Sequence, residues 1–188
     1  MFYSEKELSE FGIKHGQNVK IHKSVLFFGS ENIKIGSNVR IDAHAILSAK
    51  LPLTIGSFVH IAGGCYIYGS FGVEVGDYCG LSARTIVYSA SDDYRHGYLT
   101  GPTVPDEFRK LRSGKVVFGK HCIVGAGTII MPNVNLGTGS SIGALSLVSR
   151  DVPNYSIAAG NPLQVIGERN KVRLQELEDR HTKLIDLK

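Results

Sequence analysis

Large apolar residues recur at every sixth position along much of the chain. Over residues 118–153 they are Phe118, Val124, Ile130, Leu136, Ile142 and Val148. A helix repeats its faces about every 3.6 residues and a strand about every 2, so neither element alone produces this spacing. A chain that forms a short strand and then turns a corner does produce it. The pattern therefore predicts a coil built from short straight sides.

The same step continues toward the N-terminus with a regular interruption. Ile35, Ile41 and Leu47 are six residues apart, and the next step, to Ile55, takes eight, which gives a period of 20. The tetrads GQNV, GSNV, GSFV and GDYC accordingly start 20 residues apart, and after GKHC at position 119 the period shortens to 18. Three six-residue sides close a triangle, and the two extra residues fit a bulged corner on one edge.

A second inward position follows the large apolar residues by four and carries compact side chains. Its occupants are Val19, Val39, Val59, Cys65, Cys79, Thr85, Cys122, Thr128, Val134, Ser140, Ser146 and Val152. All three cysteines fall in this set, so we interpret them as buried thiols rather than nucleophiles or metal ligands. The predicted fold is an all-β solenoid, a triangular parallel β-helix with a narrow interior.

One internal segment lacks the repeat. Residues 89–116 contain two prolines and charges of both signs, with no six-residue step. A long segment of this kind inside a regular domain is usually functional or an interaction arm, so we expect an extruded loop.

The two ends of the chain also differ from the repeat. Ser4 and Glu7 have the spacing of a capping box for a short helix closed by Gly12, which predicts an N-terminal helical cap over residues 1–14. The solenoid is expected over 15–153. Residues 154–188 are expected to form a turn and then, from about Gly167, a C-terminal α-helix, since apolar residues there have helical spacing.

Composition excludes several classes of protein. The chain has 188 residues and 43% hydrophobic residues, without an apolar run near the roughly 18 residues that span a membrane. A net charge of +4, scattered and without basic–aromatic alternation, gives no indication of nucleic-acid binding. The first residues lack the profile of a signal peptide, so a cytoplasmic location is expected.

The repeat motif resembles that of the hexapeptide-repeat acyltransferases of the left-handed β-helix fold. GAGTIIMPNV, SSIGALSLVSRDVP and IAAGNPLQVI resemble the last coils of the acetyl-CoA-dependent branch that includes galactoside and maltose O-acetyltransferases. IVYSASDDYRHGYLTGPTVP, with VHIAGG upstream, is most similar to N-acyltransferases that modify dTDP-4-amino-4,6-dideoxysugars for surface polysaccharides such as O-antigen. The resemblance covers residues 15–170.

This resemblance implies a homotrimer with active sites in the clefts between neighbouring prisms, each covered by an extruded loop. It implies an acyl-CoA co-substrate, most simply acetyl-CoA, a nucleotide-sugar acceptor and no metal. Direct attack by the acceptor amine in a ternary complex is the expected mechanism. The residues expected to bind CoA are Gly125, Ala126, Gly143, Ala144, Asn161, Pro162 and Arg169.

At the position of the general base the chain departs from the related motifs. No histidine occurs in the SASDD stretch, and Gly63 stands where a base is found in HIAHDC-like motifs. The catalytic candidates are therefore His60, Asp92 and Asp93. For substrate binding, the candidates are Arg84, Tyr94 and His96.

Three other functions remain open at this point. O-acetylation of a sugar hydroxyl, of the galactoside acetyltransferase type, requires similar chemistry on a different acceptor. A β-helix metalloenzyme of the carbonic anhydrase kind needs three converging histidines, and the seven here contain no H-x4-H pair. A scaffold or binding protein without chemistry would show no thermal stabilisation by CoA.

Overall fold

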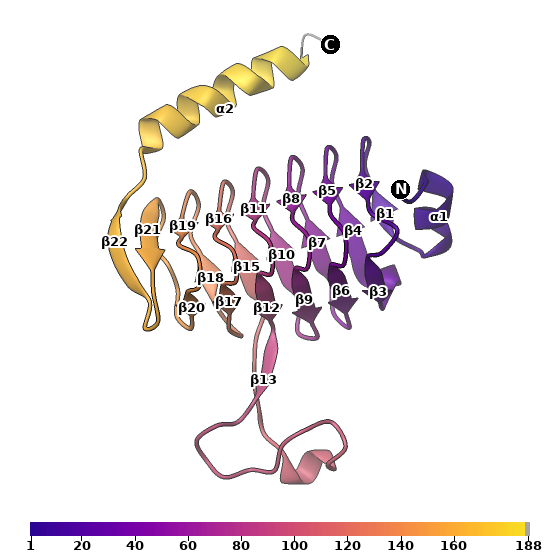
Figure 1. Cartoon of the computed structure of the whole chain (residues 1–188), viewed down its shortest axis with the longest axis vertical. Helices are drawn as coiled ribbons and strands as arrows, with labels where there is room; N and C mark the ends of the chain where they lie inside the picture. The colour runs from indigo at the N-terminus through magenta and orange to yellow at the C-terminus, as the bar shows by residue number, and fades with distance from the viewer. Residues whose placement is uncertain (187–188) are drawn as a thin grey trace.

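Each period of the sequence forms three short strands joined by corners, and the periods stack into a triangular prism (Figure 1). The computed structural model describes residues 1–186. The first sheet contains β1 (Lys14–His15), β4 (Ile33–Ile35), β7 (Leu53–Ile55), β10 (Val73–Val75), β15 (Val116–Phe118) and β18 (Asn135–Leu136). The second contains β2 (Lys20–Ile21), β5 (Arg40–Ile41), β8 (His60–Ile61), β11 (Gly80–Leu81), β16 (Ile123–Val124), β19 (Ser141–Ile142), β21 (Ser156–Ala159) and β22 (Gln164–Glu168). The third contains β3 (Leu26–Phe28), β6 (Ile46–Ala49), β9 (Tyr66–Gly69), β12 (Ile86–Tyr88), β17 (Ile129–Ile130) and β20 (Leu147–Val148).

The strand register confirms the expected all-β solenoid. Strands of successive coils pair in parallel, and the six-residue positions stack on one another, as in Leu81 on Val124 and Val124 on Ile142. These side chains fill the interior, where each is at most 3% exposed. The compact inward positions are buried as well, except Val19, which is half-buried in the first coil. Thr128 Oγ1, for example, donates to Gly143 O at 3.0 Å. Burial also raises the pKa of the Cys65 thiol, in keeping with its interpretation as a core residue.

The corner from the third sheet to the first holds the extra residues of the 20-residue periods. The extruded segment leaves from this same corner, after β12, and returns to β15 (Figure 1). It has structure of its own, since β13 (Ala90–Asp92) and β14 (Leu111–Ser113) pair as an antiparallel ribbon. A 3-10 turn, η2 (Asp106–Phe108), lies near its tip, whereas η1 (Ser30–Asn32) occupies the same corner of the first coil.

Both ends of the solenoid are covered. Helix α1 (Glu5–Glu10) has the expected capping box, with Ser4 and Glu7 exchanging hydrogen bonds, and Gly12 takes a left-handed φ of 75°. At the other end the expected C-terminal helix is present, but it begins at Lys171 and not at about Gly167. Gly167 and Glu168 belong to β22, which folds back antiparallel on β21 and so pairs the outer edge of that strand. Helix α2 (Lys171–Asp186) follows, and positions 187–188 of the predicted C-terminal segment lie outside the described residues.

Helix α2 runs back along the row of corners between the first and second sheets (Figure 1). Phe58, Tyr78 and His121, from three successive coils, form an aromatic stack there, with centroid separations of 4.9 and 5.0 Å. The Tyr78 hydroxyl is hydrogen-bonded to His181 Nδ1 at 3.1 Å, and His121 Nε2 to Glu178 at 2.8 Å. These contacts dock the helix. Neither helix in the described part of the chain has the length and apolarity needed to cross a bilayer.

Candidate active site

The catalytic candidates fall on two separate parts of the prism. His60 points outward from β8 in the second sheet. Asp92 and Asp93 lie at the root of the ribbon, which leaves after β12 at the far side of the third sheet. The face formed by the third sheet separates the two positions, so a single copy of the chain does not bring them together.

The outer surface of the second sheet changes character along the prism. The outward ladder runs from Arg40 to His60, then to Gly80 and Ile123. A hollow of about 210 Å³ opens beside His60, lined by Ala62, Gly80, Leu81, Ser82, Ala83 and Ile123. A Cβ atom on Gly80 would meet no heavy atom within 4 Å. Packing does not require glycine there, so Gly80 and its neighbour Ser82 are wall residues that the motif comparison missed.

His60 is held by a carboxylate. Its Nε2 lies 2.8 Å from Asp42 Oδ2, and Arg40 Nε donates to the other oxygen of Asp42 at 2.7 Å. Burial raises the pKa of Asp42, but the hydrogen bonds from His60 and Arg40 outweigh it and hold the pKa below its usual value. With Nε2–H donating to this carboxylate, Nδ1 of a neutral His60 carries the free lone pair.

Two of the expected CoA-binding glycines are required by the stacking of the coils. A Cβ on Gly143 would lie 2.8 Å from the Cβ of Ala159 in the next coil. On Gly125 it would lie within the contact distance of the Ala144 backbone nitrogen, so neither position admits a side chain. Ala126 and Ala144 are exposed at the corner between the second and third sheets, in the same row as the exposed Arg84. We call the small residues Gly80, Ser82, Ala126 and Ala144 the sparsely covered wall of the second sheet.

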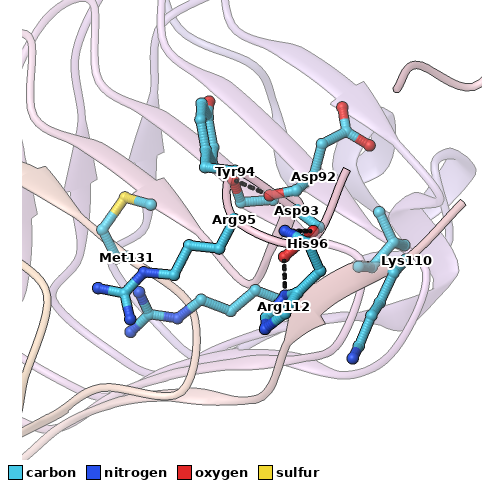
Figure 2. Close-up of a pocket in the computed structure, with 10 residues that line it drawn as sticks. Asp92, Asp93, Tyr94, Arg95, His96, Lys110, Arg112 and Met131 are labelled. Atoms are coloured by element: carbon cyan, nitrogen blue, oxygen red, sulfur yellow. Dashed lines mark hydrogen bonds and ion pairs between the residues drawn. The ribbon is translucent and has the colours of Figure 1, made fainter. Parts of the chain in front are cut away.

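The ribbon root contains a carboxylate–imidazole pair (Figure 2). Asp93 Oδ1 lies 2.8 Å from His96 Nδ1, and Oδ2 accepts the backbone N–H of His96 at 2.6 Å. The side chain of Asp93 is 12% exposed and that of His96 is 61% exposed. The hydrogen bond from His96 lowers the pKa of Asp93, so this carboxylate is ionised at neutral pH and is a weak proton acceptor. His96 Nε2 is left open for a substrate.

Two cavities meet at the ribbon root. The first, of about 450 Å³, contains Asp92, Asp93, Tyr94 and His96 among its lining residues. A second, of about 410 Å³, adjoins it through shared residues that include Asp92 and Tyr94. Met131 is also shared, and the residues that line only the second cavity are Tyr88, Ala90, Ile129 and Leu147, which are mostly apolar. Four sequence candidates, Asp92, Asp93, Tyr94 and His96, thus line one groove, in which charged side chains gather around the first cavity.

The remaining candidates lie near the C-terminal end of the solenoid. Asn161 and Pro162 are exposed in the turn between β21 and β22. Arg169 Nη1 donates to the backbone carbonyls of His121, at 2.6 Å, and Gly139, at 3.3 Å. The side chain therefore ties the segment after β22 to two coils of the solenoid. Across the described residues, no cluster of three or more His, Cys, Asp or Glu side chains could hold a metal ion.

Comparison with known proteins identifies the family. No protein-family model matches the chain. It is 41% identical over 179 residues to an Escherichia coli dTDP-4-amino-4,6-dideoxy-D-glucose acyltransferase, covering 94% of this chain and 93% of the relative. AntD, an N-acyltransferase from Bacillus cereus solved with dTDP and 3-hydroxybutyryl-CoA, superposes with a TM-score of 0.94 and 41% identity, covering 98% of each chain. A maltose O-acetyltransferase from Clostridium difficile shares the fold at a TM-score of 0.60 and 21% identity, over 89% of this chain and 75% of its own. The chain therefore belongs to the β-solenoid acyltransferase family that contains AntD and the E. coli dideoxyglucose acyltransferase.

Proposed function

We propose that the protein transfers an acyl group from acyl-CoA to the amino group of a dTDP-4-amino-4,6-dideoxysugar. The observation that carries the proposal is the match over nearly the whole chain, ribbon included, to AntD. Structures of AntD variants hold dTDP-4-amino-4,6-dideoxyglucose together with coenzyme A. The acylated sugar is a building block for a surface polysaccharide, and we place the reaction in the cytoplasm, where acyl-CoA and nucleotide sugars are made.

The working form is a homotrimer in this proposal. Beyond the ribbon-root cavities, the outer face of the third sheet is rich in apolar and aromatic side chains, among them Leu26, Phe28, Ile46, Tyr66, Tyr68 and Ile86. Such a face favours contact with another copy. Leu145, 79% exposed at the adjoining corner, extends it. A threefold arrangement lets the ribbon root of one copy reach the His60 wall of the next, which joins the two halves of the site.

The chemistry is a direct acyl transfer. The uncharged amine nitrogen attacks the thioester carbonyl carbon, the carbon–sulfur bond breaks, and CoA leaves as the thiolate. The bound ammonium loses one proton to a base before attack, and the nitrogen loses a second as the amide forms, which goes to the CoA thiolate. The ionised Asp93 attracts the substrate ammonium and orients His96, while His96 Nε2 or His60 Nδ1 accepts a proton. The cysteines are buried in the core, so no acyl-enzyme on sulfur is needed or accommodated.

The test of activity compares acceptors that differ in one group. Purified protein is incubated with acetyl-CoA or 3-hydroxybutyryl-CoA and either dTDP-4-amino-4,6-dideoxyglucose or dTDP-6-deoxyglucose, which carries a hydroxyl in place of the amine. We expect free thiol to be released with the amine only. Release with the hydroxyl sugar alone would support the O-acetyltransferase alternative and overturn the N-acyl assignment.

The shared site is tested by mixing subunits. His60→Ala and Asp93→Asn chains, each impaired alone, are co-expressed with different tags and the mixed trimers are isolated. In each mixed trimer one of the three interfaces, roughly a third, combines an intact His60 with an intact Asp93 from the neighbour, so activity returns in part. Mixed trimers no more active than the parents would refute a site built from two copies.

A further inference from the structure

Three cations surround the first ribbon-root cavity, and none has been assigned a role. Arg95, Lys110 and Arg112 line it together with the Asp93–His96 pair (Figure 2). None of the three forms an ion pair with a carboxylate among the residues that the structure describes. Arg109, on the same extruded segment, does pair with Asp106. Asp92 and Asp93 also line the cavity, and Asp93 is paired with His96, so the three cations outnumber the carboxylates there.

The ribbon fixes the positions of these cations. Arg112 lies opposite Ser91 in the β13–β14 pairing, and the Asp93 N–H donates to the Lys110 carbonyl at 3.0 Å, one step further along. Arg112 Nη2 also donates to Ser149 O at 3.0 Å, which ties its side chain to the solenoid. In Figure 2 the side chains of Arg95 and Arg112 extend in the same direction, toward Met131.

We infer that Arg95 and Arg112, with Lys110 beside them, bind the diphosphate of the nucleotide sugar. This inference rests on the proposed function and assigns the part of the site that recognises the acceptor. Like charges held around one cavity repel each other until an anion enters. A guanidinium group presents a planar fork of N–H donors that matches two phosphate oxygens, and charge-assisted bonds of this kind are the strong ones.

The surroundings favour a nucleoside diphosphate over the other diphosphate in the reaction, that of CoA. The adjoining cavity is lined by Tyr88, Ile129 and Leu147 and provides the flat apolar surface that a pyrimidine base needs. The Asp93 carboxylate lines the same cavity as the arginines. It can therefore attract the ammonium group of a sugar whose diphosphate is bound by the arginines. CoA instead requires an extended surface for its pantetheine arm, and the sparsely covered wall of the second sheet offers one.

The inference predicts a selective loss of affinity. Isothermal titration of the wild type, Arg95→Gln and Arg112→Gln with dTDP, dTMP, CoA and dephospho-CoA separates the two sources of diphosphate. We expect each variant to bind dTDP roughly 10- to 100-fold more weakly, because a charge-assisted contact is lost, and to bind both forms of CoA as the wild type does. The affinity for dTMP, which lacks the second phosphate, is expected to fall less in the variants than the affinity for dTDP does.

The controls keep the result interpretable. Arg173→Gln removes an exposed arginine from α2, away from the ribbon, and is expected to change neither affinity. Arg95 makes no side-chain hydrogen bond in the described structure, so Arg95→Gln tests binding without disturbing the fold. Wild-type affinity for dTDP in both variants, or a loss confined to CoA, would overturn the inference while leaving the proposed function intact. A wild type that binds CoA but no dTDP would overturn both.

Discussion

Substitutions at two glycines of the second sheet test different things: Gly80 borders a proposed binding surface, whereas Gly125 is required by the packing of the coils. In Gly80→Val the new side chain points outward from β11, where a Cβ meets no heavy atom within 4 Å. Valine suits a strand and reduces the freedom of the unfolded chain, so the free energy of unfolding should stay level or rise by up to about 1 kcal/mol. The two methyl groups occupy part of the 210 Å³ hollow beside His60. We expect kcat/KM to fall at least about tenfold, since the acyl donor can no longer approach.

Gly125→Ala adds a single carbon to the same sheet with the opposite consequence. Its Cβ would overlap the Ala144 backbone nitrogen, so two coils must separate. Overpacking of this kind costs about 1–3 kcal/mol, and for a chain of this size each kcal/mol lowers Tm by about 2–4 °C. Thermal unfolding followed by circular dichroism, with thiol release on the same samples, measures both quantities. A fully active Gly80→Val protein would show that the hollow beside His60 is not part of the site, and a Gly125→Ala protein as stable as wild type would refute the packing argument.

Two further predictions concern charged groups. Asp93→Asn should lower turnover far more than it lowers CoA affinity, because the carboxylate orients His96 and attracts the amine; unchanged turnover in a steady-state assay removes Asp93 from the mechanism. Burial disfavours the ionised form of Glu178 and by itself would raise the pKa of this carboxyl group. Hydrogen bonds with His121 and Lys120 outweigh the effect of burial and lower the pKa below 4.5 in the folded state. Its stabilising contribution is therefore complete above about pH 4.5 and is lost as the pH falls through the folded pKa. Chemical unfolding from pH 7 to 3 should show Glu178→Gln less stable than wild type at pH 7 and less sensitive to acid, and parallel pH curves would contradict this.

The solenoid is predictable from the sequence because its narrow interior fixes the size of the side chain at each inward position. Every coil must place one large apolar side chain on each side and a compact one beside it, so Val124 and Cys122 report their burial directly. The periods of 20 and 18 residues likewise identify the corner that carries extra residues. The capping box at Ser4 is a local motif and is equally readable.

The ribbon and the site are harder to predict, because they depend on contacts that no period encodes. The Asp93–His96 pair arises from a turn inside the extruded segment, and only the β13–β14 pairing brings Lys110 and Arg112 to it. The separation of His60 from Asp93 follows from the corner at which the ribbon leaves, which the motif comparison does not specify. The different roles of Gly80 and Gly125 do have a sequence signal: one precedes the large apolar residue of its side and the other follows it.

The packing of helix α2 on Phe58, Tyr78 and His121 affects how the solenoid unfolds locally. In a solenoid each coil contacts only its neighbours, so the ends can fray one coil at a time. Because helix α2 contacts three consecutive coils, none of these coils can unfold separately unless the helix first detaches. Hydrogen exchange in the coils of β7 to β17 should consequently rise as one block when the chain is shortened before Lys171. The surface beside His60 that we propose for the acyl donor would lose its rigidity in the same event.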